Sequence, residues 1–414
     1  MVRPVSFRMT ENRRSMLVLV VLCGVIISIC MGLRQSLGLY QRPMMLEAGV
    51  SAAAFGLSIA LQNIVWGVTQ PFIGAWADRS GARLVAIVCA LIYAAGVVLM
   101  IYSGRLPGAL EVSGFLIGVG TAGCGLGTLV GTVSRMTPPE TRIQTVGLVS
   151  AAGSLGTFVI APLGQSMIGA FGWQGALAGY AVLAASMLLL ALPIRETVFK
   201  DSSSVKRQDL GEAVREATGH RGFVFMTLAF FACGFQLIFL TTHLPAYLQL
   251  CGVAPGVSAT AIALIGLFNA IGTYIFGLLG ARYNQRRLLA LIYLLRTTFI
   301  AVFLLVPVSA ASTLIFASAM GFLWLGVTPL ITGIIGRVFG LAHFNTLYGM
   351  AFLSHQVGSF FGAWMGGVVF DRAGNYDFAW GALLVIGAAA FTLQWLMNEQ
   401  PPRARAPALP AAPA

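Results

Sequence analysis

The sequence predicts an all-α membrane protein in which twelve transmembrane helices form two similar six-helix bundles. Three observations support this fold class: an apolar composition, apolar segments that recur along the chain, and motifs that repeat between its two halves. Of the 414 residues, 58% are hydrophobic and 9% are charged, and the mean hydropathy is +0.86. Soluble domains carry about 25% charged residues, so a soluble enzyme domain does not fit this chain.

The apolar segments are about 20 residues long, which is enough to cross a bilayer as helices. We place spans at residues 16–40, 52–77, 83–103, 108–133, 143–169, 174–193, 222–250, 257–281, 288–307, 311–337, 345–370 and 376–397. The first segment is longer than the apolar part of a signal peptide, lacks a small-residue cleavage site and leads into further spans. We therefore interpret it as the first transmembrane helix.

The longest connection separates six spans from six. It divides the chain into an N-terminal bundle (1–193), a cytoplasmic central loop (194–221), a C-terminal bundle (222–397) and a cytoplasmic tail (398–414). Apolar residues at helical spacing among charged ones predict a short amphipathic helix in the central loop, at Leu210, Ala213, Val214 and Ala217. The Pro/Ala-rich tail is expected to be disordered.

Lysine and arginine are distributed unequally between the two sides of the predicted membrane. With the N-terminus in the cytoplasm, twenty of the 25 basic residues lie in cytoplasmic segments and three lie in outer loops. Basic residues favour the cytoplasmic side, so both termini are expected there. The net charge of +12 is therefore interpreted as a topology signal, and no nucleic-acid partner is expected.

Short motifs repeat at a near-constant offset. The segment GAWADRSGAR (74–83) follows span two, and GLLGARYNQRR (277–287) follows span eight, 203 residues later. Likewise GSLGTFVIAPLGQ begins at Gly153 in span five, and GSFFGAWMGGVVF begins at Gly358 in span eleven, 205 residues later. Two such halves indicate a duplicated transporter, since channels and membrane enzymes seldom need this arrangement.

The first of these motifs resembles the signature that major facilitator superfamily members carry between spans two and three, G-x-x-x-D-R-x-G-x-R. It is matched by Gly74, Asp78, Arg79, Gly81 and Arg83. The resemblance covers the whole chain and implies the major facilitator fold. It also implies that Asp78 accepts hydrogen bonds from a neighbouring helix N-terminus, as a cytoplasmic latch of the outward-facing state. The alternative is a simple turn with solvated charges.

Three further segments, RPMMLEAGVS, HLPAYL and FDRAGNYDFAW, resemble those of bacterial members near the monocarboxylate and oxalate–formate carriers. This implies a multi-pass protein of the bacterial cytoplasmic (inner) membrane. Those carriers usually have an arginine in span eight, whereas span eight of this chain has none and Asn269 is its polar centre.

All thirteen acidic residues fall in loops, tails or span edges, whereas the ionisable residues within spans are Arg34, Arg296, His243 and His355. An ionisable residue at membrane depth costs roughly 2.5–3.5 kcal/mol on insertion scales, so each is a functional candidate. A fixed cation without an acidic partner favours an anion, and a guanidinium can bind a carboxylate in a bidentate fork. A carrier of cationic drugs usually needs a carboxylate within the membrane.

Arg34 is the leading candidate for a substrate ligand. It lies about 27 Å along the first span, which places it in the outer part of that span. The alternatives are snorkelling to the outer headgroups and pairing with Glu47 or with a helix C-terminus. Gln35 would supply a further donor. Arg296, early in span nine, is expected to reach the inner interface or brace the loop between spans eight and nine, and the alternative is a substrate ligand.

His355 lies near the middle of span eleven, which lines the transport cavity in the family. It is the candidate for proton coupling as well as substrate binding, and the alternative is a neutral histidine bonded to a backbone carbonyl or to Gln356. His243 could act as a kink or a gate, or it could bind substrate. The remaining substrate-binding candidates are polar residues that could also join helices, namely Gln62, Trp66, Asn269 and Gln356.

The sequence therefore predicts a secondary transporter that moves a small organic anion, a carboxylate, by alternating access with proton coupling or anion exchange. An efflux pump for drugs or amphipathic metabolites is the alternative. We expect no enzyme activity and no cofactor, because no nucleotide-binding loop or nucleophile motif occurs. The six cysteines are scattered singly, so no metal site is expected. The expected partners are the small-molecule organic anion and the lipid bilayer, and the expected state is a monomer.

Overall fold

The computed structural model describes residues 5–137, 139–194, 210–339 and 344–400. Helices account for all the secondary structure in these ranges, as the sequence predicts. They are α1 (Val5–Ser36), η1 (Leu37–Tyr40), α2 (Gln41–Ala48), α3 (Ala52–Ser80), α4 (Ala82–Ile101), α5 (Ala109–Cys124), α6 (Leu126–Met136), α7 (Pro139–Ala191), α8 (Leu210–Gly219), α9 (Arg221–Leu250), α10 (Pro255–Arg282), α11 (Gln285–Leu305), α12 (Ala310–Phe322), α13 (Val327–Phe339), α14 (Phe344–Ala373) and α15 (Asp377–Leu396).

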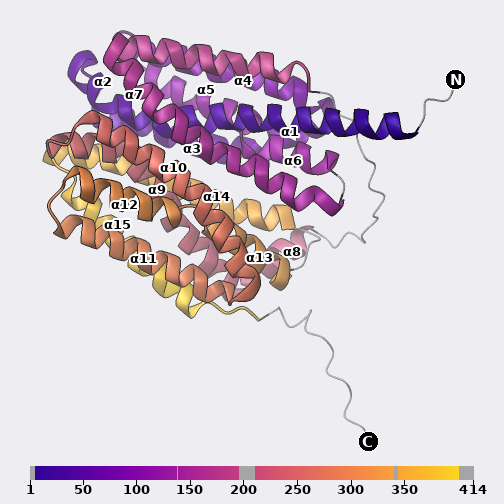
Figure 1. The fold of residues 1–414 in the computed structure, drawn as a ribbon. Helices are drawn as coiled ribbons and strands as arrows, with labels where there is room; N and C mark the ends of the chain where they lie inside the picture. Colours follow the sequence, from indigo (N-terminus) through magenta and orange to yellow (C-terminus); the bar gives the residue numbers. More distant parts are fainter. Residues whose placement is uncertain (1–4, 138, 195–209, 340–343, 401–414) are drawn as a thin grey trace, which may run out of the picture.

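The helices of the two halves of the chain form two adjoining groups. In Figure 1, α1 to α7 (indigo to magenta) lie above α9 to α15 (orange to yellow). The start of α1 and the end of α15 lie at the same end of the molecule, termed here the terminal end; the opposite end is termed the far end. The bundle boundaries at 193, 221 and 397 stay predictions. The predicted amphipathic helix falls on α8, whereas residues 195–209 and 401–414 lie outside the described residues.

Ten helices in the described part of the chain are long and apolar enough to cross a membrane. One of them, α7, contains two crossings. The hydroxyl of Tyr180 donates to the main-chain oxygen of Ile160 at 3.3 Å, although twenty residues of continuous helix would span about 30 Å. The chain therefore reverses at Gly172, where φ is 69° and ψ is 173°. The 30-residue α14 packs against α9 and α3 and is long enough to cross a bilayer.

The predicted spans four and ten are present as the apolar segments Ala109–Met136 and Ala310–Phe339, but each is interrupted by a break that was not predicted. Span four breaks at Gly125, whose extended backbone separates α5 from α6, and span ten breaks between α12 and α13. Unwound backbone at membrane depth needs other partners for its polar groups. At the first break, the Thr128 hydroxyl donates to the main-chain oxygen of Ala122 at 2.7 Å, and Gln70 also reaches that oxygen at 3.3 Å.

The two halves meet along α3 and α14, and the contact closes only toward the far end. Gly56, Gly67 and Gly74 share one face of α3, because seven and eleven residues are close to two and three helical turns. A Cβ at Gly56 would lie 2.4 Å from the main-chain oxygen of Ala363, and one at Gly67 would lie 2.8 Å from Gln356. A Cβ at Gly74 would meet nothing within 4 Å.

The halves also meet along α7 and α10, and this contact likewise closes only toward the far end. A Cβ at Gly266 on α10 would lie 2.7 Å from the main-chain oxygen of Ser154 on α7. Gly147, two turns from Ser154 toward the terminal end, has open space beside it, as does Gly349 on α14. The described state is therefore closed at the far end, and its halves separate toward the terminal end.

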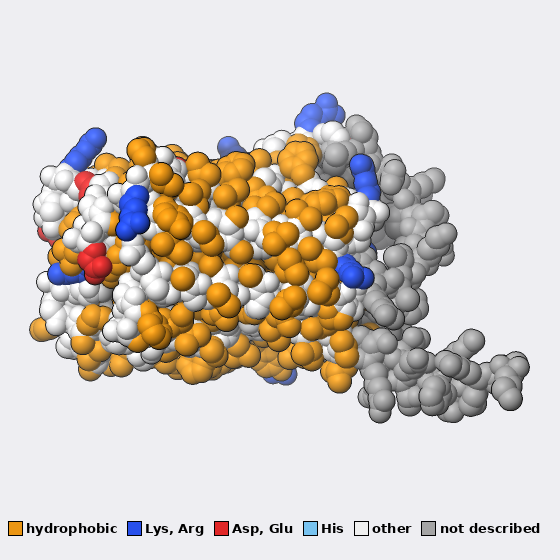
Figure 2. Space-filling view, turned by 90° about the horizontal axis from the view of Figure 1, so that it is seen from above, with side chains coloured by type: hydrophobic (Ala, Val, Ile, Leu, Met, Phe, Trp, Pro, Cys, Tyr) orange, Lys and Arg blue, Asp and Glu red, His pale blue; other side chains and the backbone are white. Residues whose placement is uncertain are grey.

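The outer surface matches a membrane environment. Figure 2 shows a broad hydrophobic band across the middle of the face in view, with charged side chains mostly near the two ends of that face. Large apolar side chains on this surface, including Phe72, Leu189 and Val385, are more than half exposed. Such exposure is ordinary for a surface that faces lipid and would be unfavourable in water.

Candidate functional site

Arg34 occupies the last turn of α1 and points toward α3. Its Nη1 donates to the side-chain oxygen of Asn63 at 2.8 Å, and its Cζ lies 4.9 Å from the ring centroid of Trp66. The first apolar segment is longer than the predicted span 16–40, because η1 and α2 extend it to Ala48. Arg34 therefore lies nearly midway along Met16–Ala48 and not near the end of the segment.

The described partners of the Arg34 guanidinium are electrically neutral. Its Nε is buried and has no hydrogen-bond partner among the described residues. Glu47, the acidic alternative from the sequence, is exposed at the far end. A half-buried cation without a charged partner is costly within a membrane, and a paired anion would reduce this cost. The site is therefore electrostatically suited to an anionic group beside Arg34.

The other half of the molecule approaches Arg34 through α14. Gln356 Nε2 donates to the main-chain oxygen of Asn63 at 2.8 Å, and Gln356 Oε1 lies 3.1 Å from His355 Nδ1. His355 Nε2 is buried without a hydrogen-bond partner in the described part of the chain. We term Arg34, Asn63, Trp66, His355 and Gln356 the central cluster. It joins α1, α3 and α14 at the level where the halves begin to separate.

Aromatic rings adjoin the central cluster. The Phe352 ring lies 5.3 Å from that of Trp66 in an edge-to-face arrangement and stacks on His355 at 5.9 Å. Phe230 on α9 also contacts His355, at a centroid distance of 4.7 Å. The cluster therefore combines one fixed cation and two amide side chains with flat apolar surfaces.

Three predicted substrate ligands lie elsewhere. Gln35 is half-buried and makes no hydrogen bond to the central cluster in the described structure. Gln62 is fully buried, and neither atom of its amide has a partner among the described residues. Asn269 bonds to the Ser154 hydroxyl at 2.8 Å and accepts from the main-chain nitrogen of Leu325 at 2.9 Å, so it braces α10 against α7 and the break in span ten.

Arg296 has a structural position that the sequence did not reveal. Its guanidinium is fully buried and donates to the main-chain oxygens of Leu323 and Trp324. These oxygens lie where α12 ends, so Arg296 satisfies carbonyls that the break in span ten releases. The expectation that Arg296 reaches the inner interface or braces the loop before α11 is therefore wrong.

The residues of the predicted latch lie where α3 turns into α4 at the terminal end. Gly81 ends α3 and begins α4 with a φ of 87°, a conformation that favours glycine. Arg79 and Arg83 are exposed, and Gly74 has open space beside it. The side chain of Asp78 lies outside the described residues, so its role as a latch stays a prediction.

The far end is closed by a second polar contact between the halves. His243 Nε2 donates to the main-chain oxygen of Ala363 at 2.6 Å, so Nδ1 accepts from Gln41 Nε2 at 3.2 Å. Gln41 Nε2 also lies 3.4 Å from the hydroxyl of Tyr376. These contacts join α2 of the first half to α9, α14 and the start of α15.

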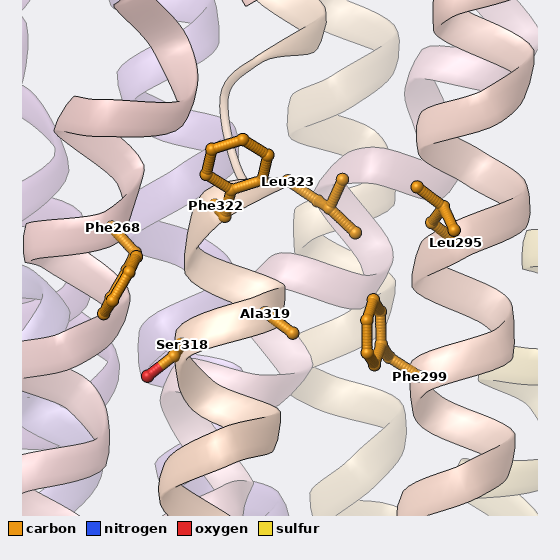
Figure 3. Close-up of a pocket in the computed structure, with 7 residues that line it drawn as sticks. All are labelled: Phe268, Leu295, Phe299, Ser318, Ala319, Phe322 and Leu323. Atoms are coloured by element: carbon orange, nitrogen blue, oxygen red, sulfur yellow. The ribbon is translucent and has the colours of Figure 1, made fainter. Parts of the chain in front are cut away.

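An apolar pocket of about 380 Å³ lies away from the central cluster, between α10, α11 and α12 (Figure 3). It is lined by Phe268, Leu295, Phe299, Ser318, Ala319, Phe322 and Leu323. Its one hydroxyl, that of Ser318, donates to the main-chain oxygen of Leu314. The pocket therefore offers no cation or free donor to an organic anion.

The fold and the central cluster define a polytopic membrane transporter: two groups of spanning helices closed at one end, with a polar cluster between them. The model of the Major Facilitator Superfamily matches residues 20–363. The chain therefore belongs to this superfamily, whose members are transporters rather than enzymes.

Several known transporters are similar to this chain in sequence. It is 25% identical over 392 residues to the oxalate:formate antiporter of Oxalobacter formigenes, covering 91% of this chain and 88% of that protein. It is 27% identical over 328 residues to monocarboxylate transporter 13 of Rattus norvegicus, covering 77% and 74%. Multidrug resistance protein 2 of Bacillus subtilis is 24% identical over 366 residues, covering 84% and 87%.

The fold is also similar to a solved structure. A bacterial homologue of the human lysosomal transporter Spinster, in an inward-facing and occupied conformation, matches with a TM-score of 0.72 at 17% identity. The match covers 91% of this chain and 96% of that one. At this identity the likeness concerns the fold.

Proposed function

We propose that the protein transports a small organic anion, a carboxylate, by alternating access, and that Arg34 binds the carboxylate. The observation that carries the proposal is the environment of the Arg34 guanidinium, which lies mid-membrane against Asn63 and Trp66 with its Nε unpartnered among the described residues. Hydrogen bonds between a guanidinium and a carboxylate are charge-assisted and directional, so this group would both attract and orient the substrate.

The names of two relatives support this substrate class, because they refer to oxalate, formate and monocarboxylates. The aromatic surfaces of Trp66 and Phe352 would pack against the aliphatic part of a monocarboxylate longer than formate. His355 and Gln356 complete the proposed substrate contacts from the other half. A substrate held by both halves at once would favour their closure around it.

We further propose that the terminal end faces the cytoplasm of a bacterial inner membrane and that the protein works as a monomer. Arginines described at that end include Arg79, Arg83, Arg282, Arg286 and Arg337, in agreement with the positive-inside rule. In this orientation the described state opens toward the cytoplasm. His355 is proposed as the proton-coupling residue, because its buried Nε2 could take up a proton beside the bound anion.

Efflux of drugs or amphipathic metabolites is the second candidate function. The similarity to multidrug resistance protein 2 favours it. The central cluster argues against cationic drugs as substrates, because its one fixed charge is the Arg34 cation. An exporter of anionic or neutral amphipathic compounds would be compatible with this charge.

Uptake into proteoliposomes tests the proposal. Oxalate, formate, lactate and longer aliphatic mono- and dicarboxylates are supplied as labelled compounds under an imposed pH gradient. Saturable uptake of at least one of them is expected in the wild type and in Arg105→Gln, which removes an exposed far-end arginine. It is expected to be lost in Arg34→Gln. Absence of carboxylate uptake in the wild type, or full uptake in Arg34→Gln, would contradict the proposal.

A further inference from the structure

The pattern D-R-x-G occurs at the C-terminal ends of α3 and α14, the two helices along which the halves meet. The helix α3 ends at the terminal end in residues 78–81, with the sequence DRSG, and α14 ends at the far end in residues 371–374, with the sequence DRAG. In both cases the helix stops at a glycine with a positive φ, 87° for Gly81 and 69° for Gly374, a backbone conformation that favours glycine. The two ends are therefore alike in sequence and in the positive φ of the glycine.

The second copy makes a direct contact with the opposite half. Asp371 Oδ1 accepts from the main-chain nitrogen of Ala52 at 3.0 Å, and Oδ2 accepts from that of Ala53 at 2.7 Å. The next amide, of Ala54, donates to the Ser51 hydroxyl at 3.1 Å. The first three amides of α3 are thus satisfied, and two of them depend on a carboxylate from the other half. The first amides of a helix have no acceptor within the helix, and the helix dipole is positive at this end. Both properties favour a carboxylate at the N-terminus of α3.

The surrounding backbone holds the contact in place. One turn before Asp371, a Cβ at Gly367 would lie 2.2 Å from the main-chain oxygen of Ala52, so only a glycine allows α14 to approach α3 this closely. If the halves separated at the far end, Asp371 would move away from α3. The amides of Ala52 and Ala53 would then lose their acceptor.

We propose that Asp371 is a latch that stabilises the state closed at the far end, and that it is the counterpart of the latch expected at Asp78 for the opposite state. Asp371 on α14 would bind the N-terminus of α3, and Asp78 on α3 would bind the N-terminus of α14. The two contacts would form alternately as the transporter cycles. This inference concerns the balance between conformations and is independent of the substrate and of Arg34.

Distances between spin labels on the purified protein, without substrate, test the latch. For the far end, Arg105→Cys in the first half is paired with native Cys251, which is exposed in the second half. For the terminal end, Ser80→Cys, at an exposed position that is not a signature residue, is paired with Arg282→Cys in a Cys251→Ser background. In Asp371→Ala the ratio of far-end-open to far-end-closed molecules is expected to rise about fivefold, the typical effect of losing a helix cap. The terminal-end labels should move closer together in the same variant.

Two controls separate the latch from general loss of stability. Ser51→Ala removes a cap from α3 within its own half, and Asp377→Ala removes another far-end acid; both should leave the label distances unchanged. Asp371→Asn, which keeps one acceptor oxygen, should shift the ratio in the same direction and provides the test if Asp371→Ala aggregates. Unchanged distances in the Asp371 variants, or an equal shift in Ser51→Ala, would overturn the proposal.

Discussion

Arg34 on α1 donates to the side-chain oxygen of Asn63 on α3 at 2.8 Å, and the main-chain oxygen of Asn63 accepts from Gln356 in the other half at the same distance. Asn63 therefore links the guanidinium directly to the interface between the halves. An anion that binds Arg34 would compete with Asn63 for its donors. Occupancy of the proposed site would then act on the contact between α3 and α14.

Replacing Asn63 with an acid should block the proposed site. In Asn63→Asp, the new carboxylate would form a charge-assisted hydrogen bond with Arg34 and neutralise the cation intended for the substrate. Such bonds contribute about 1.5–3 kcal/mol, so uptake below saturation is expected to fall at least about tenfold. Proteoliposome uptake measures this loss, and thermal unfolding should show that the protein stays folded.

The matched control is Asn63→Ala, which removes the neutral partner and leaves the Arg34 cation available. This variant should retain uptake within a few-fold of the wild type. If Asn63→Asp transports as well as Asn63→Ala, the charge of Arg34 does not govern substrate binding.

Arg296 should matter for stability rather than for substrate recognition. Its guanidinium donates to the carbonyls at the end of α12, so Arg296→Gln would leave buried acceptors unsatisfied. The midpoint of thermal unfolding is expected to fall by about 5 °C, whereas the KM of the protein that remains folded should stay unchanged. A raised KM with an unchanged midpoint would instead assign Arg296 to the substrate site.

His355 should be required for proton coupling but not for binding. In His355→Gln the side chain can still donate to an anion but can no longer take up a proton. Accumulation driven by an imposed pH gradient should therefore be lost, while exchange of labelled for unlabelled substrate at equal pH continues. Accumulation that persists in His355→Gln would place the proton-coupling group elsewhere.

Two glycines on one face of α3 should have opposite effects on the conformational balance. The side chain in Gly56→Val would collide with the main chain at Ala363 and force the far end open. Gly74→Val meets open space in the described state, so its side chain would obstruct only closure of the terminal end. Far-end label distances should lengthen in Gly56→Val and stay short in Gly74→Val. A shift in the same direction in both variants would argue against the alternating contact of α3 and α14.

The span positions could be predicted because each span carries its own apolar segment. The breaks at Gly125 and after Phe322 could not, because they depend on partners from other spans: Gln70 at the first and Arg296 at the second. Apolar composition continues across both breaks. Hydropathy along the sequence therefore indicates one span at each of these places, whereas the structure has two helices.

The candidate site was predicted in part. Arg34, Trp66, His355 and Gln356 were expected and lie together, although their role in binding stays a proposal. Gln62 was chosen over its neighbour Asn63, since successive residues on a helix point about 100° apart and polarity alone does not select the face. Asp371 was missed because its partner, Ala52, lies 319 residues away along the chain.

Equilibrium binding to the purified protein tests the central claim most directly. The carboxylate with the highest uptake would be titrated by calorimetry into the wild type, Arg34→Gln and Arg34→Lys, with thermal unfolding measured in parallel. The account predicts a Kd at least about tenfold higher in Arg34→Gln, a smaller increase in Arg34→Lys and unchanged folding, because the lost interaction is a charge-assisted hydrogen bond. An unchanged Kd in Arg34→Gln would contradict the assignment of Arg34 as the anion ligand.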